Sequence, residues 1–144
     1  MPAIRTEADG ATLTLNGRII QDYIEGDTIE LAPANPNSAH VNGVRTNSVS
    51  ITSRSDRGVY DLTVRVQMFS EDDTFLNGLL NTNPPEIING SLKESFIRDD
   101  AEGVETWTLE NGTITEQPTK TKNTQDGNAT MQYVIRFRNA TRSL

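Results

Sequence analysis

Regular alternation of apolar and polar residues is the feature of this sequence that most constrains its fold. Residues 62–68 read LTVRVQM and residues 130–138 read TMQYVIRFR, so apolar side chains recur at every second position. Successive side chains of a β-strand point to opposite faces, and this period therefore predicts strands with one buried and one polar face. Turn-forming residues separate such segments about every ten to fifteen residues, which predicts a mainly β protein.

The turn residues also predict which strands pair. Asn16-Gly17 is a strong signal for a two-residue hairpin turn, which would pair residues 11–15 with residues 18–23. A second, central hairpin is expected between residues 48–52 and the LTVRVQM segment, joined by the turn sequence Ser-Asp-Arg-Gly. The other expected strands are residues 28–31, 92–98, 104–109, 113–117 and 130–138, with a turn at Asn111-Gly112 and a polar loop over residues 118–129.

One segment departs from the strand pattern. Ser70 is suited to cap the N-terminus of a helix, and Asp73 can return the hydrogen bond three residues later. Apolar residues follow at helical spacing as far as Leu80, and prolines at positions 84 and 85 end the pattern. The sequence therefore predicts one short helix, which would pack across a sheet or close the end of a barrel.

A long polar segment separates the two expected hairpins. Residues 32–43 read APANPNSAHVNG and contain two prolines, three asparagines and few apolar side chains. This composition predicts a long loop. Loops of this length are uncommon in compact domains and are often functional.

Size and composition indicate a modest core. The 144 residues suffice for one domain, expected to span residues 1–144, but the hydrophobic fraction is only 34%. Typical globular domains contain about 45–50% apolar residues. The low fraction favours thin sheets with one hydrated face, or a protomer that completes its burial against neighbouring copies. The sequence has neither the pattern of a signal peptide nor a run of about 18 apolar residues that would span a membrane.

Little in the sequence supports an enzymatic or metal-binding function. The chain has no cysteine, and its single histidine, His40, lies in the polar loop. Acidic runs at residues 71–73 and 99–102 lack the spacing of a calcium-binding loop and fit a helix N-terminus and a turn. A formal net charge of -7 argues against ordinary nucleic-acid binding, which needs a basic surface. We therefore expect no catalytic residues, cofactor or metal.

The order of these elements over residues 9–138 resembles the tail tube proteins of tailed bacteriophages and the related inner tube proteins of contractile injection systems. The features that carry the resemblance are the N-terminal hairpin, the long loop, the LTVRVQM strand, the helix DDTFLNGLL and the last strand ending in YVIRFR. The resemblance implies a β-sandwich or small barrel with one short flanking α-helix and a long inter-ring loop. It also implies a structural virion protein of the phage tail, assembled in the host cytoplasm.

Within this family the expected role is that of the major tail tube protomer, which forms hexameric rings that stack into a hollow tube. Residues 32–44 would form the ring-stacking loop, and the central hairpin would line a negatively charged lumen that conducts DNA. Like charges would let double-stranded DNA pass without binding. Implied partners are other copies of the chain and the sheath, baseplate, tape measure and terminator proteins. The candidate residues are Pro33, Asn35, Pro36, Asn37 and His40 for ring stacking, and Glu30, Asp56 and Asp61 for the lumen.

Arg54, Arg57 and Arg65 are unexpected in a negative lumen, and some of them are expected to pair with acids of the neighbouring protomer. Two other functions are compatible with the sequence. A tube-initiating baseplate protein or a tail terminator on the same fold would form a single ring. A monomeric β-sandwich binding module would instead present an aromatic patch around Tyr60, Trp107 or Tyr133.

Overall fold

The computed structural model describes residues 3–24, 26, 28–45 and 47–144, and in it the chain is mainly β with one short helix. Nine strands form one antiparallel sheet with the order β3-β2-β8-β9-β11-β7-β4, where β1 also pairs with β8 and β10 with β11. β5 and β6 form a separate two-stranded sheet. The bounds are β1 Ile4–Arg5, β2 Thr12–Leu15, β3 Arg18–Ile20, β4 Ile29–Pro33, β5 Ser38–Asn42, β6 Val49–Ser53, β7 Tyr60–Gln67, α1 Glu71–Leu80, β8 Ile88–Arg98, β9 Ala101–Ile114, β10 Thr119–Lys122 and β11 Ala129–Ser143.

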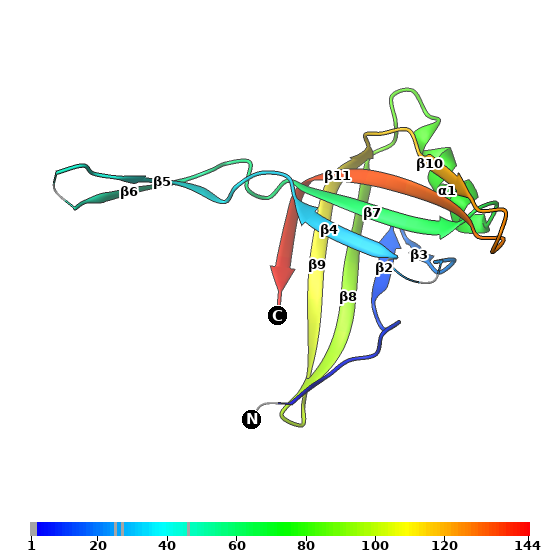
Figure 1. The fold of residues 1–144 in the computed structure, drawn as a ribbon, viewed down its shortest axis with the longest axis horizontal. Helices are drawn as coiled ribbons and strands as arrows, with labels where there is room; N and C mark the ends of the chain where they lie inside the picture. The colour runs from blue at the N-terminus through cyan, green and yellow to red at the C-terminus, as the bar shows by residue number, and fades with distance from the viewer. Residues whose placement is uncertain (1–2, 25, 27, 46) are drawn as a thin grey trace.

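The large sheet bends around one core. In Figure 1, β4, β7 and the first part of β11 run across the direction of β8 and β9. The segment after β3 approaches β7, where Tyr23 forms an isolated bridge with Val66 and the Gln67 N–H donates to the Asp22 carbonyl over 2.9 Å. The described residues form antiparallel sheets without a closed barrel. The largest fully buried side chains are Leu13, Leu15, Ile20, Leu62, Val64, Val66, Leu76, Ile88, Leu109, Tyr133, Ile135 and Phe137.

The alternating segments behave as their sequence predicts. In β7, Leu62, Val64 and Val66 are buried, whereas the residues between them are only partly covered. β11 continues the same pattern over residues 133–137 and pairs with β7. The Asn16-Gly17 turn joins β2 to β3, and both of its residues have positive φ, as this kind of turn requires.

The helix is also confirmed. The Ser70 side chain accepts a hydrogen bond from the Asp73 N–H over 3.2 Å, and the Asp73 carboxylate accepts one from the Phe69 N–H over 2.9 Å. Leu76 and Leu79 are the apolar helix residues that are buried in the core. Figure 1 places α1 at the end of the sheet beside β10.

The predicted central hairpin is wrong in its pairing. β6 pairs with β5, residue Ser38 opposite Ser53 and Asn42 opposite Val49, and β7 pairs instead with β4 and β11. The expected loop at residues 32–43 is therefore wrong as well, because it contains the end of β4 and all of β5. All residues of β5 and β6 are exposed, on both faces of the hairpin. Neither strand therefore has a buried face whose apolar residues could indicate its partner.

Two smaller predictions fail for related reasons. Asn111-Gly112 forms no chain reversal, since β9 runs through it. The register between β8 and β9 shifts at this point, Asn111 has a φ of 53°, and its N–H donates to the Asn89 side chain over 2.9 Å. Asn111 and Gly112 thus form a bulge within a long strand. A bulge, like a hairpin turn, can contain a residue with positive φ. The expected polar loop over residues 118–129 contains β10, which pairs with β11.

Candidate assembly surfaces

A β-hairpin projects from the sheet and is the most exposed feature of the molecule. We call residues 34–59 the arm; it contains β5 and β6 and extends far from the body in Figure 1. All residues of β5 and β6 are exposed. The exposed residues nevertheless include large apolar side chains, and Val44 near the tip is 99% exposed. The other large apolar side chains exposed on the arm are Val41, Val49 and Ile51.

The arm lacks a core of its own. An isolated two-stranded hairpin is marginally stable in water unless another surface covers one of its faces. Cross-strand neighbours share a face, so His40 lies beside Ile51 and Asn42 beside Val49, whereas Val41 and Ser50 point to the opposite face. Apolar groups thus occur on both faces of an extended and unsupported hairpin. This geometry suits an arm that is buried against another molecule.

Hydrogen bonds fix the base of the arm to the sheet. The Ala34 N–H donates to the Val59 carbonyl over 2.9 Å, and the Ala140 N–H of β11 donates to the Gly58 carbonyl over 2.8 Å. Arg54 donates two hydrogen bonds to the carboxylate of Asp56, at 3.0 and 2.9 Å. The hydrogen bond from Arg54 lowers the pKa of Asp56 below its ordinary value. Asp56 therefore lies at the arm base, and its main partner belongs to its own chain.

The other two candidate acids lie together on the solvent face of the sheet. Glu30 is opposite Thr63, and Asp61 is two residues from Thr63 on the same strand, so both point away from the core. Arg136 donates two hydrogen bonds to Asp61, at 2.8 and 3.0 Å, and this contact lowers the pKa of Asp61. Glu30 is exposed.

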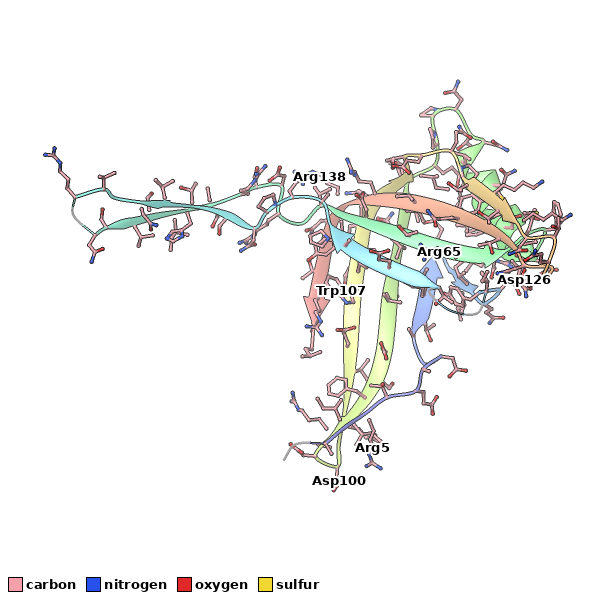
Figure 2. All side chains as sticks on the ribbon, in the orientation of Figure 1. Arg5, Arg65, Asp100, Trp107, Asp126 and Arg138 are labelled. Carbon is pink, nitrogen blue, oxygen red and sulfur yellow. The ribbon has the colours of Figure 1, made fainter. Side chains whose placement is uncertain are left out.

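This solvent face carries two acids and three arginines, a formal excess of one positive charge. Besides the two acids it carries Arg65, which donates to the Gln132 carboxamide oxygen over 3.0 Å, and the outward-facing Arg136 and Arg138 of β11. Figure 2 shows Arg65 on this face and Arg138 near the arm base. Some of the arginines were expected to pair with acids of a neighbouring protomer. Arg54 instead pairs with Asp56 of its own chain.

The candidate stacking residues lie at the end of β4, in the segment that follows it and in β5. Pro33 ends β4, and Asn35, Pro36 and Asn37 connect β4 to β5. The Asn35 side chain donates to the Asp56 carbonyl over 3.3 Å, which places it at the arm base. His40 lies within β5 on the exposed arm. The structure therefore brings four of the five candidates onto the arm.

The buried carboxylate of Asp72 links the helix to two other segments. The sequence reasoning assigned this residue only to the helix N-terminus. Asp72 is 1% exposed and accepts hydrogen bonds from Arg18 Nε at 2.8 Å and from the N–H groups of Gln21 and Asp22 at 2.7 and 2.8 Å. Burial alone would raise the pKa of Asp72, but these donors together lower it. The nearby Tyr23 hydroxyl is buried, and this burial, followed by the charge of Asp72, raises its pKa to about 12.

Of the three aromatic residues expected to form the patch of a binding module, Tyr60 and Trp107 are partly exposed and lie together, whereas Tyr133 does not reach the surface. Tyr133 is fully buried and its hydroxyl donates to the Asp73 carboxylate over 2.6 Å. Tyr60 and Trp107 contact one another edge to face, with ring centroids 5.3 Å apart. The described residues contain no group of three or more acidic or histidine side chains arranged to hold a metal ion. Over the same residues, no helix has the length and apolar character needed to cross a membrane.

The second projection of the molecule contains two strands that the sequence predicted, residues 92–98 and 104–109, and the turn between them. The sequence reasoning did not predict that these strands extend beyond the body. We call residues 93–105 the acidic hairpin; it is the outer part of β8 and β9 and contains five acidic and two basic side chains. It forms the lower end of the molecule in Figures 1 and 2. Arg5 and Asp100, labelled in Figure 2, form an ion pair there at 3.1 Å. The clustering of acids at residues 94–105 was the available signal.

The fold and its surfaces define a mainly β protein with an antiparallel, bent sheet, one short helix and a projecting arm. No family model and no curated protein sequence matches the chain. One similar solved structure is a chain of the anti-feeding prophage baseplate, determined by cryo-electron microscopy with six-fold symmetrisation. The TM-score is 0.51 at 11% sequence identity, and the match covers 92% of this chain and 90% of that chain. The likeness thus extends over nearly the whole fold.

Proposed function

We propose that this chain is a structural protomer of a phage tail or a related injection system, and that it assembles into hexameric rings. The observation that carries this proposal is the arm, because an exposed two-stranded hairpin with apolar groups on both faces requires a partner surface. In a ring assembly the arm would reach the adjacent ring. At about 3.3 Å per residue, its outgoing side over residues 34–45 spans about 40 Å.

Within this class we favour the tail tube protomer, whose rings stack without limit. The fold likeness to a chain of a six-fold symmetrised baseplate supports a ring-forming protein. It also favours a second candidate, a tube-initiating ring of the baseplate, because the neighbour comes from a baseplate. Both candidates use the same fold and the same arm.

Electron microscopy and sedimentation of the purified full-length chain separate these candidates. A tube protomer yields hollow tubes of variable length, whereas a baseplate protein yields single six-fold rings or short stacks of fixed size. A chain that stays monomeric at high concentration, with no rings on any support, would exclude both candidates and favour a binding module.

In the assembled ring, the solvent face with Glu30 and Asp61 would line the channel. Arg136 neutralises Asp61, so Glu30 is the remaining acid among the named charges of this face and offsets the nearby Arg65 and Arg138. The substitution Glu30→Lys should leave rings and tubes intact but reduce infectivity, because a cationic ring of side chains retains phosphates. Glu86→Lys makes the same charge change at another exposed acid and serves as the control. Equal infectivity of both variants would argue against this lumen assignment.

A further inference from the structure

The two projections of the molecule differ in charge. The arm contains three arginines and one aspartate, whereas the rest of the chain contains ten basic and nineteen acidic side chains. The acidic hairpin alone holds five of those acids and two bases. Figure 1 shows the arm and the acidic hairpin leaving the body in different directions. Opposite charges on separate projections complement one another between copies of the chain rather than within one copy.

The acidic hairpin carries a groove on one face. A cavity of about 230 Å³ lies between β1, β8, β9 and β11. Ile4 and Phe96 form part of its apolar lining, and Ile4 is 69% exposed. The Phe96 ring lies over Gly103 of the opposite strand, whose missing side chain leaves room for it. The groove thus offers apolar side chains between charged ones on an otherwise acidic projection.

Two acids and two arginines line the groove, and of these Glu105 and Arg142 form an ion pair with each other. Glu94 lies directly opposite Glu105, which places two like charges on adjacent strands. Glu105 forms an ion pair with Arg142, and the guanidinium of Arg98 lies 5.9 Å from the centroid of the Phe96 ring. In the described part of the chain, the Glu94 side chain has no hydrogen bond or ion pair. An additional cation entering the groove would relieve the repulsion between the two glutamates.

The tip of the arm has the matching chemistry. Val44 is almost fully exposed, and Arg45 follows it directly and is exposed as well. We propose that the arm tip of one copy occupies this groove on a second copy, with Val44 against Ile4 and Phe96 and Arg45 paired with Glu94. The inference rests on the proposed ring-forming function and names the surface that receives the arm. Since arm and groove are different surfaces of one chain, the contact is heterologous and propagates from copy to copy.

Cysteine cross-linking tests this contact directly, because the native chain contains no cysteine. Two single variants, Val44→Cys and Ile4→Cys, are assembled together and oxidised, and the disulfide is identified by mass spectrometry of the joined peptides. We expect a 44–4 disulfide between chains. The control mixes Val44→Cys with Ile87→Cys, whose parent residue is 62% exposed but precedes the far end of β8. A 44–87 yield equal to the 44–4 yield would overturn the proposal.

Charge exchange tests the proposed ion pair independently. Arg45→Glu and Glu94→Arg should each reduce the assembled fraction in sedimentation and the yield of the 44–4 disulfide. The double variant should restore both, and failure of this rescue would overturn the pairing. Electron microscopy of the same samples separates the two proposals: rings or tubes without a 44–4 disulfide overturn the groove contact and leave the proposed function standing. Absence of any ring overturns both.

Discussion

Asp72 joins three separate segments of the chain through one carboxylate. It lies in the first turn of the helix, binds Arg18 on β3 and accepts hydrogen bonds from the backbone just before Tyr23. A charge-assisted hydrogen bond in a buried site is stronger than a neutral one, and loss of the charge leaves donors unsatisfied. This residue therefore holds the helix against the edge of the sheet.

The substitution Asp72→Asn should lower the free energy of unfolding at neutral pH by about 2–4 kcal/mol, since it removes a buried charge that has three donors. Urea denaturation followed by circular dichroism measures the change. Glu71→Gln is the matched control, because Glu71 is one residue away and only 3.8 Å from the same Arg18 but its side chain is 91% exposed. Exposed ion pairs contribute little, so the control should stay close to the wild type. Equal losses in both variants would contradict the role of burial.

The lowered pKa of Asp72 also predicts how stability depends on pH. The unfolded chain, in which the pKa of an aspartate is about 3.9, takes up the proton first as the pH falls. The stabilisation from Asp72 is therefore complete above about pH 4 and decreases as the pH falls through the folded-state pKa. Thermal unfolding at several pH values should show the wild type and Asp72→Asn converging in acid. Parallel curves down to the lowest pH would exclude this linkage.

The sequence predicted the helix cap but missed the partners of Asp72. Ser70 and Asp73 are three residues apart, so the hydrogen bond from the Asp73 N–H to the Ser70 side chain follows from local spacing, and the Asp73 carboxylate returns a hydrogen bond to the Phe69 N–H, next to the cap. Arg18 and Gln21 are about fifty residues from Asp72 along the chain, and only the packing of the helix beside β3 brings them close.

At the scale of elements, two glycines lie beneath aromatic rings of the neighbouring strand. A Cβ at Gly112 would lie 2.5 Å from ring atoms of Phe137, and a Cβ at Gly103 would lie 2.4 Å from the Phe96 ring. Phe137 is fully buried, whereas Phe96 is partly exposed. An added methyl group would thus meet a ring in the core at Gly112, and a partly exposed ring that has room to move at Gly103.

Gly112→Ala should therefore destabilise the fold by about 1–3 kcal/mol through overpacking, because the buried ring and its neighbours cannot shift freely. Gly103→Ala places the same methyl group under the movable Phe96 ring and should have a clearly smaller effect. The midpoints of urea denaturation of the two variants provide the comparison. A Gly103→Ala loss as large as that of Gly112→Ala would show that both rings are held equally tightly.

Strand pairing was predicted correctly only where a short turn joins the partners. The Asn16-Gly17 hairpin follows from two residues that favour positive φ. The central hairpin was wrong because residues 54–59 do not reverse the chain but connect β6 to β7 along one side of a longer hairpin. The strands β5 and β6 are exposed on both faces, and each face of the hairpin carries apolar as well as polar side chains, so local patterning cannot specify their partner.

For the whole molecule, the arm and the body are expected to be separable. The Arg54 N–H donates to the Asn37 carbonyl over 3.2 Å, so a two-residue Asn-Gly turn can replace residues 38–53. The core residues are untouched by this deletion, and the melting temperature should change little. Tubes or stacked rings should be lost, as seen by electron microscopy. Wild-type stacking by the shortened chain would contradict the assembly role of the arm.

The sequence by itself determined the strand period, the N-terminal hairpin, the capped helix and the buried face of the last strand, because these depend on residues close together in the chain. Tertiary structure decided the rest. It placed residues 34–59 on an arm, paired Asp61 with Arg136, buried Asp72 against β3 and separated a basic arm from an acidic hairpin. These outcomes depend on contacts between distant segments, and local sequence preference carries no information about such contacts.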